Sequence, residues 1–309
     1  PEAARRCVHS RTMPWHARLQ LDYTARRSAV PADGSSAALP ALSTARTPAR
    51  TVAHFRHDGP LRILQSLYPE GESICHNVMV HPPSGLVGGD VLDIDVRVGA
   101  GAHGLVTTPG ATRFYRSEGE LALQTTRLTL AEGARLEWLP LEAIAYDSCL
   151  AENRLNVTLA PGAEMMGWDI TALGLPGADK PFLQGRFQQH IELPGVWLER
   201  GRIEGADSHL MDGPHGLAGH RCCASLFFLT GTPLARERRA ELLEAAQQTA
   251  QEHAQARTAG ATSPDAQVVV LRVLSPMVEP AVDLLRTVWS RWRQLAWQLP
   301  ADAPRIWST

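Results

Sequence analysis

The sequence predicts a mainly β fold, built as an irregular stack of antiparallel hairpins, with two or so helices in the C-terminal part. Three observations predict it. Apolar and polar residues alternate in many short segments, 25 Gly and 22 Pro favour turns, and one strand–turn pattern recurs along the chain. The recurrence leaves an alternative open, because any β protein reuses glycine at its turns.

Alternation is clearest at residues 91–98, where four apolar side chains share one face and the charged side chains share the other. This pattern is typical of a half-buried strand. Similar segments predict further strands at residues 19–23, 61–68, 121–130, 155–159, 186–193, 196–203 and 268–274.

The recurring pattern is a strand, a two-residue turn, a Gly-Ala pair and a second strand. Its three copies span residues 96–102, 128–134 and 157–163, so the pairs beginning at Gly101 and Gly133 are 32 residues apart and the next follows after 29. A period of this length suits successive coils laid on one another.

Two segments near the C-terminus are predicted to be helical. Thr232 and Pro233 resemble an N-cap and first turn, followed by helix formers up to residue 256. A second helix over residues 280–299 carries an apolar stripe that favours core packing, with a partner surface around Trp289 and Trp292 as the alternative.

The remaining segments predict one domain over residues 16–309. Residues 1–15 are interpreted as an extension outside the fold, and residues 31–50 as a flexible surface loop because they lack periodicity and are rich in Ala, Ser and Pro. Residues 258–265 are interpreted as a linker to the last strand.

Composition excludes several classes of function. A formal net charge of −2 without a basic patch disfavours nucleic-acid binding, and the longest apolar segment, residues 224–229, is too short to cross a membrane. Five cysteines without paired spacing favour a reducing, cytoplasmic location.

The common catalytic motifs are also missing or misplaced. Residues 99–104 match GxGxxG, but a β pattern follows where a nucleotide-binding fold needs a helix. No phosphate-binding loop or hydrolase signature occurs. The His- and Cys-rich segment 209–223 leaves one alternative open, a metal-dependent β-fold hydrolase, although its spacings fit no zinc motif.

Prolines and glycines are dense between residues 68 and 117 and predict a tightly determined backbone. Asp90 is interpreted either as an acceptor for free amides or as a functional residue. Arg113, Tyr115 and Arg116 are predicted interface anchors that could equally pair with nearby glutamates.

Four motifs resemble the urease accessory protein D family, called H in some bacteria. They are HPPSGLVGGD at 81–90, TTPGATRFYRS at 107–117, EWLPLEAIAYD at 137–147 and PRIWST at 304–309. The resemblance covers roughly residues 16–309, except 31–50. Ser84 departs from it, because the family usually has glycine there.

The resemblance implies an irregular β-helix-like stack and a non-catalytic chaperone. It implies binding to the F accessory protein, the G-type GTPase and apo-urease, with no permanently bound cofactor. It further implies transient nickel(II), delivered to urease through an internal water-filled tunnel.

A relay for nickel needs loose ligands, because Ni²⁺ would stay in a closed cage of imidazole and thiolate. The candidates lie in or beside the family motifs, and Glu142 matches an acidic position that the family uses. A surface or structural role remains an alternative for each, as does a scaffold without any metal role. The candidates are Glu70, Glu72, Cys75, His76, His81, Asp90 and Glu142.

Overall fold

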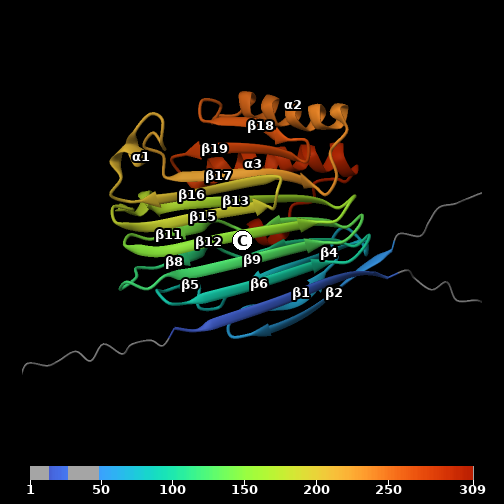
Figure 1. The fold of residues 1–309 in the computed structure, drawn as a ribbon, viewed down its shortest axis with the longest axis horizontal. Coiled ribbons are helices and arrows are strands. Elements are labelled where there is room, and N and C mark those ends of the chain that lie inside the picture. The colour runs from blue at the N-terminus through green and yellow to red at the C-terminus, as the bar shows by residue number, and fades with distance from the viewer. Residues whose placement is uncertain (1–13, 27–48, 309) are drawn as a thin grey trace, which may run out of the picture.

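A computed structural model describes residues 14–26 and 49–308 (Figure 1). The predicted extension and the predicted loop at 31–50 therefore lie largely outside the described residues. Trp15, assigned above to the extension, contacts the fold: its backbone N–H donates to Oδ1 of Asp90 (3.3 Å) and its ring packs on His81.

The described strands form two facing sheets. Sheet A has the order β16-β15-β12-β9-β6-β1-β2, and sheet B has the order β18-β19-β17-β13-β10-β7-β4-β3. The bounds in sheet A are β1 His16–Arg26, β2 Arg50–Asp58, β6 Val91–Val98, β9 Ala122–Leu130, β12 Cys149–Leu159, β15 Gly185–Leu193 and β16 Trp197–Glu204. Those in sheet B are β3 Arg62–Leu67, β4 Ile74–Val80, β7 His103–Thr107, β10 Arg135–Leu139, β13 Glu164–Leu175, β17 Cys222–Thr230, β18 Ala259–Asp265 and β19 Val268–Ser275.

The predicted stack of coils is confirmed. Each coil runs through one strand of sheet B, a short bridging strand and one strand of sheet A, and then turns back into sheet B. Gly101, Gly133 and Gly162 sit at these turns with φ of 67°, 64° and 75°, which explains the recurring glycine. The bridging strands are β5 Gly85–Leu86, β8 Thr112–Phe114, β11 Ala143–Ala145 and β14 Lys180–Pro181.

Pairing direction differs from the expected antiparallel hairpins. The two long strands of a coil belong to different sheets, so each pairs with the equivalent strand of the next coil, which runs the same way. β6, β9 and β12 are therefore parallel, as are β7, β10 and β13. Antiparallel pairs close the ends, as in β1–β2 and β15–β16.

The linker prediction for residues 258–265 is wrong. Most of this segment is β18, an edge strand that pairs antiparallel with β19 and shifts register between Thr262 and Asp265. Its Thr-, Ser- and Pro-rich composition is not typical of a strand. The segment nevertheless forms one because the free edge of β19 supplies backbone hydrogen-bond partners.

The two C-terminal helices are confirmed with shifted ends. The remaining helices are short, and no helix among the described residues has the length and apolar character needed to span a bilayer. α2 (Arg236–Glu252) begins after Ala235, which provides no side-chain cap, so Thr232 does not cap it. α3 (Val278–Trp292) continues as a π-helical turn, η2 (Arg293–Trp297). The others are η1 Pro176–Ala178, α1 Ser208–Asp212 and η3 Arg305–Ser308.

The core has two layers, one on each side of sheet B. Between the sheets lie inward residues such as Ile94, Leu128 and Val157. On the other side, α2 and α3 pack on sheet B, and Figure 1 shows α2 beside β18. The predicted stripe of α3 faces this second layer, while Leu295 beyond it is 44% exposed.

Candidate functional site

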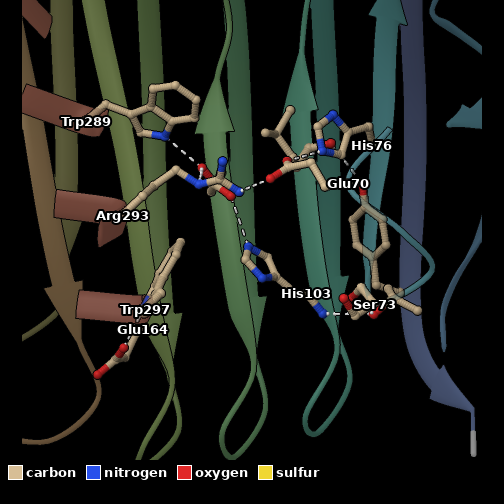
Figure 2. Close-up of polar contacts among 12 residues, drawn as sticks. Glu70, Ser73, His76, His103, Glu164, Trp289, Arg293 and Trp297 are labelled. Atoms are coloured by element: carbon tan, nitrogen blue, oxygen red, sulfur yellow. Dashed lines mark hydrogen bonds and ion pairs between the residues drawn. The ribbon is translucent and has the colours of Figure 1, made fainter. Parts of the chain in front are cut away.

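A buried carboxylate, Glu137, is the centre of a polar network between sheet B and α3. Figure 2 shows other members of this network, among them His103, Trp289 and Arg293. Glu137 lies on β10 with a fully buried side chain. Oε1 accepts from Nε2 of His103 on β7 (3.0 Å), and Oε2 accepts from Nε1 of Trp289 on α3 (2.7 Å). Nε of Arg293 lies 3.2 Å from the same Oε2.

Arg293 connects this centre to a second carboxylate. Its fully buried guanidinium donates from Nη2 to Oε2 of Glu70 (2.7 Å) and from Nη1 to the carbonyl of Pro300 (2.6 Å). Oε1 of Glu70 accepts from Nε2 of His76 on β4 (2.8 Å). Burial alone would raise the pKa of Glu70, but the His76 hydrogen bond and the Arg293 charge hold it below the ordinary value.

Burial favours the neutral form of the His103 imidazole. Burial lowers its pKa more strongly than the hydrogen bond and charge of Glu137 raise it. Its ring meets Trp297 edge-on at 5.0 Å between centroids, and Trp297 donates to Oε2 of Glu164 (2.6 Å).

Both oxygens of Glu137 and of Glu70 are thus occupied by protein donors. Among the described residues no three His, Cys, Asp or Glu side chains gather in a way that could hold a metal ion. This closed network ties α3 and η2 to β4, β7 and β10, and we assign it a structural role.

A second polar system lies on the opposite face of sheet B, between the two sheets. Gln124, Asn153 and Gln189 occupy one register position on β9, β12 and β15 and point inward. Nε2 of Gln124 donates to Oδ1 of Asn153 (3.1 Å), and Nδ2 of Asn153 donates to Oδ1 of Asp169 on β13 (3.3 Å). We call Gln124, Asn153, Asp169 and Gln189 the polar chain.

The polar chain is incompletely paired and borders two cavities. Neither polar atom of the buried Gln189 amide has a hydrogen bond of normal geometry, but the amide lies close enough to Asp169 to lower the pKa of that carboxyl. Asp169 and Gln189 line a cavity of about 410 Å³, and Gln124 lines another of about 280 Å³ beside His81. Burial raises the pKa of Asp169 to about 7, and the nearby Glu199 adds to the effect.

Among the seven predicted nickel candidates, the structure joins Glu70 to His76 by a hydrogen bond and places Asp90 near enough to His81 to act on its pKa. Glu72 is exposed and pairs with Arg50 (3.3 Å). Cys75 lies in the core between the sheets, 3.6 Å from the amide oxygen of Asn77.

The other candidates lie near the turns that end the strands of sheet B. The Asp90 carboxylate accepts hydrogen bonds from the backbone N–H groups of Trp15 (3.3 Å) and Val87 (2.9 Å). This is the structural role that the sequence left open for Asp90. His81 borders the smaller cavity with a buried, unpaired Nε2, and burial lowers its pKa. Glu142 lies in a groove outside the sandwich.

Ser84, where the family pattern has glycine, adopts φ of 67°, so the turn tolerates serine in the left-handed region that favours glycine. Its N–H donates to the carbonyl of His81 (2.8 Å).

The predicted partner residues separate into two groups. Arg113 and Tyr115 lie on or next to β8, and Tyr115 packs on Tyr146 at 5.1 Å between centroids. Hydrogen bonding to Tyr115 raises the pKa of Arg113. Arg116 is exposed. Trp289 and Trp292 are buried against sheet B, so neither indole forms a surface for a partner.

The His- and Cys-rich segment does not form a metal site. Cys222 and Cys223 are neighbours on β17, so their side chains point to opposite faces of sheet B, into different core layers. Burial raises the pKa of both thiols, which opposes metal binding by thiolate.

The sequence analysis missed the residues that organise both polar systems. Gln124, Asn153 and Gln189 each break an otherwise apolar inward series, and this break was an available signal. Glu137 and Arg293 carried no such signal, because their partners are distant in the chain.

Comparison with known proteins gives concordant matches. The sequence matches the family model described as UreD urease accessory protein over residues 36–308. A urease accessory protein UreD from Variovorax paradoxus is 62% identical over 297 residues, covering 96% of this chain and all of the relative. One from Polaromonas sp. strain JS666 is 62% identical over 296 residues, with coverage of 96% and 100%. One from Methylibium petroleiphilum is 49% identical over 292 residues, covering 90% and 95%.

Proposed function

Because the chain belongs to the UreD family of urease accessory proteins, we propose that it serves urease maturation as a non-catalytic scaffold in the cytoplasm. In this role it binds the F accessory protein, the G-type GTPase and apo-urease, and helps to deliver nickel to the urease active site. The four cysteines in the described part of the chain are free thiols, which suits a reducing compartment.

The observation that carries the nickel part of the proposal is the polar chain between two cavities. Ni²⁺ binds N/O/S sites tightly, so a relay requires few and weak ligands in succession. The polar chain offers one carboxylate, Asp169, together with amide oxygens and the hydroxyl of Thr171, which lies 3.4 Å from Oδ2 of Asp169. Such a set supports brief residence of the ion.

The Glu137 network is unsuited to this task. A cation entering it would have to displace Arg293, His103 or Trp289 from oxygens that they already occupy. We therefore place Glu70 and His76 outside the nickel route, although both were candidates.

Docking in this proposal uses the narrow face formed by the bridging strands. β5, β8 and β11 pair in parallel there, and they carry Arg113, with Tyr115 directly after β8. Tyr and Arg are the side chains most often found at the centre of protein interfaces.

The test measures urease activity and nickel per urease in cells lacking this protein, complemented with Asp169→Ala, at limiting and at excess nickel. We expect nickel content at limiting nickel to fall at least about tenfold, with partial recovery in excess nickel. Glu132→Ala, at an exposed turn, is the matched control and retains full activation.

Two outcomes would overturn parts of the proposal. Full activation in cells without the protein, at ordinary nickel, would refute the maturation role. Normal nickel content with Asp169→Ala, while the partners still bind, would leave a scaffold without a metal role.

A further inference from the structure

A groove of about 270 Å³ lies outside the sandwich, where α3 begins and β13 ends. Its walls are largely apolar and come from β11, η1 and the residues before α3. Met277 on this wall is 38% exposed, and Pro276 beside it is exposed. The main apolar lining residues are Ile144, Leu175, Pro176, Met277 and Val278.

Two carboxylates, from Glu142 and Glu279, also line the groove. Both lie near Cys222. Burial is the main cause that raises the pKa of this thiol, and the charges of Cys223, Glu142 and Glu279 raise it further. Neither carboxylate group forms a hydrogen bond or ion pair with another residue that the structure describes.

The nearby guanidinium groups are already engaged. Arg221, which lines the groove, donates to Oδ1 of Asp212 (2.7 Å) and to the carbonyl of Met211 (3.0 Å). A hydrogen bond to Tyr115 is the main cause that raises the pKa of Arg113, and the charge of Glu142 adds to it, while Nε of Arg113 has no hydrogen-bond partner. The groove therefore presents two carboxylates that form no hydrogen bond or ion pair within the described part of the chain, beside exposed apolar surface.

The rim of the groove is preformed. Gly174 has φ of 73° where the chain turns back to pair with β14, and a Cβ there would lie 2.6 Å from the carbonyl of Lys180. A Cβ on Gly177 would lie 3.2 Å from the end of Met277, so η1 packs closely against this side chain. A rigid rim lowers the entropy lost on binding.

We propose that this groove docks a protein segment that presents a large apolar side chain next to a lysine or arginine. The apolar side chain would cover Met277, and the cation would pair with Glu142 and Glu279. Acidic segments would be repelled by the same two carboxylates. The inference rests on the proposed function, because the partner is then a protein of the urease maturation complex.

The test uses the full chain with purified accessory proteins and apo-urease, and measures the affinity for each partner. For the partner that uses the groove, we expect Glu142→Lys with Glu279→Lys to weaken binding about tenfold or more. Glu142→Gln with Glu279→Gln should weaken it less, because no repulsion is added. Glu237→Lys, in the first turn of α2, is the charge-matched control that leaves affinity unchanged. Near-UV circular dichroism checks that each variant is folded.

A photo-crosslinking residue in place of Met277 identifies the bound segment by mass spectrometry. A crosslinked segment with a lysine or arginine beside a large apolar residue supports the proposal. Unchanged affinity of the lysine variant for every partner, or crosslinks only to acidic segments, would overturn it. The proposed function would still hold if cells lacking the protein failed to activate urease, so the two failures can be told apart.

Discussion

The two faces of sheet B carry two buried polar systems that differ in completeness. On the helix side, Glu137 and Glu70 have all their oxygens occupied by His103, Trp289, Arg293 and His76. On the side facing sheet A, the amide of Gln189 lies beside a cavity and contacts Asp169 without a hydrogen bond of normal geometry.

This difference indicates which polar system stabilises the fold and which one can still bind water or an ion. A buried polar group without a partner costs free energy, so a network whose carboxylate oxygens all have donors stabilises the fold more than one with an unsatisfied amide. Within the first network, Nε of Arg293 forms an ion pair with Glu137 but no hydrogen bond of normal geometry. Incomplete pairing beside a cavity is useful only where water or a passing ion supplies the missing contacts. Three substitutions and one titration test this comparison.

The largest expected effect is on the closed network. Glu137→Ala leaves Arg293 as a buried charge without its central partner and frees Trp289 and His103 from their acceptor. We expect the free energy of unfolding to fall by about 3–5 kcal/mol in chemical denaturation. A loss no larger than that of the exposed control Glu132→Ala would contradict the structural role.

The next effect concerns the pH dependence that Asp169 causes. Folded Asp169 keeps its proton up to about pH 7, whereas the unfolded residue releases it near its ordinary value of 3.8. The native state therefore binds more protons between these values, and its stability falls as pH rises toward 7. Glu199, Arg272 and Cys223 face the same cavity.

Asp169→Asn removes this dependence. At pH 8 we expect the variant to be about 1–2 kcal/mol more stable than the unmodified protein, after allowing for water in the cavity. Denaturation from pH 5 to pH 8 measures the difference, and parallel stability curves for the two proteins would contradict the assignment.

A smaller rise in stability is expected when Gln189 is replaced. Gln189→Leu removes two buried polar atoms without a hydrogen bond of normal geometry, together with the contact of the amide with Asp169, and keeps most of the side-chain volume. We expect stability to rise by about 1 kcal/mol in denaturation, while nickel per urease falls in the complementation assay. A clear loss of stability would show that the Gln189 amide is paired after all.

The smallest expected effect comes from His103. Because its folded pKa is lowered, the unfolded state binds the proton first as pH falls below the ordinary value of 6.5, and stability declines there. Titration of the imidazole by NMR checks the cause, and a pKa above 6.5 would contradict it. The two faces of sheet B thus lose stability in opposite pH directions.

Local patterns predicted much of the fold. The alternation at 91–98 matches β6, and the Gly-Ala turns mark the successive coils. The Pro-containing edge strand β18 was not predicted. Its residues pair with β19, and the alternation of side chains within one segment does not reveal such a pairing. Of the candidate site residues, Glu70 and His76 form a hydrogen bond with each other, a pairing that the sequence analysis did not predict although only six positions separate them.

By itself, the sequence determined the mainly β class, the period of the stack, the two C-terminal helices and the family. These depend on side-chain periodicity and turn chemistry within a few residues. Tertiary structure alone decided that Arg293 meets Glu70, 223 positions away, and that Asn153 lies between Gln124 and Asp169. The reason is physical: a polar side chain becomes a structural centre or an open ligand according to the partners that strand register and helix packing bring within hydrogen-bonding distance.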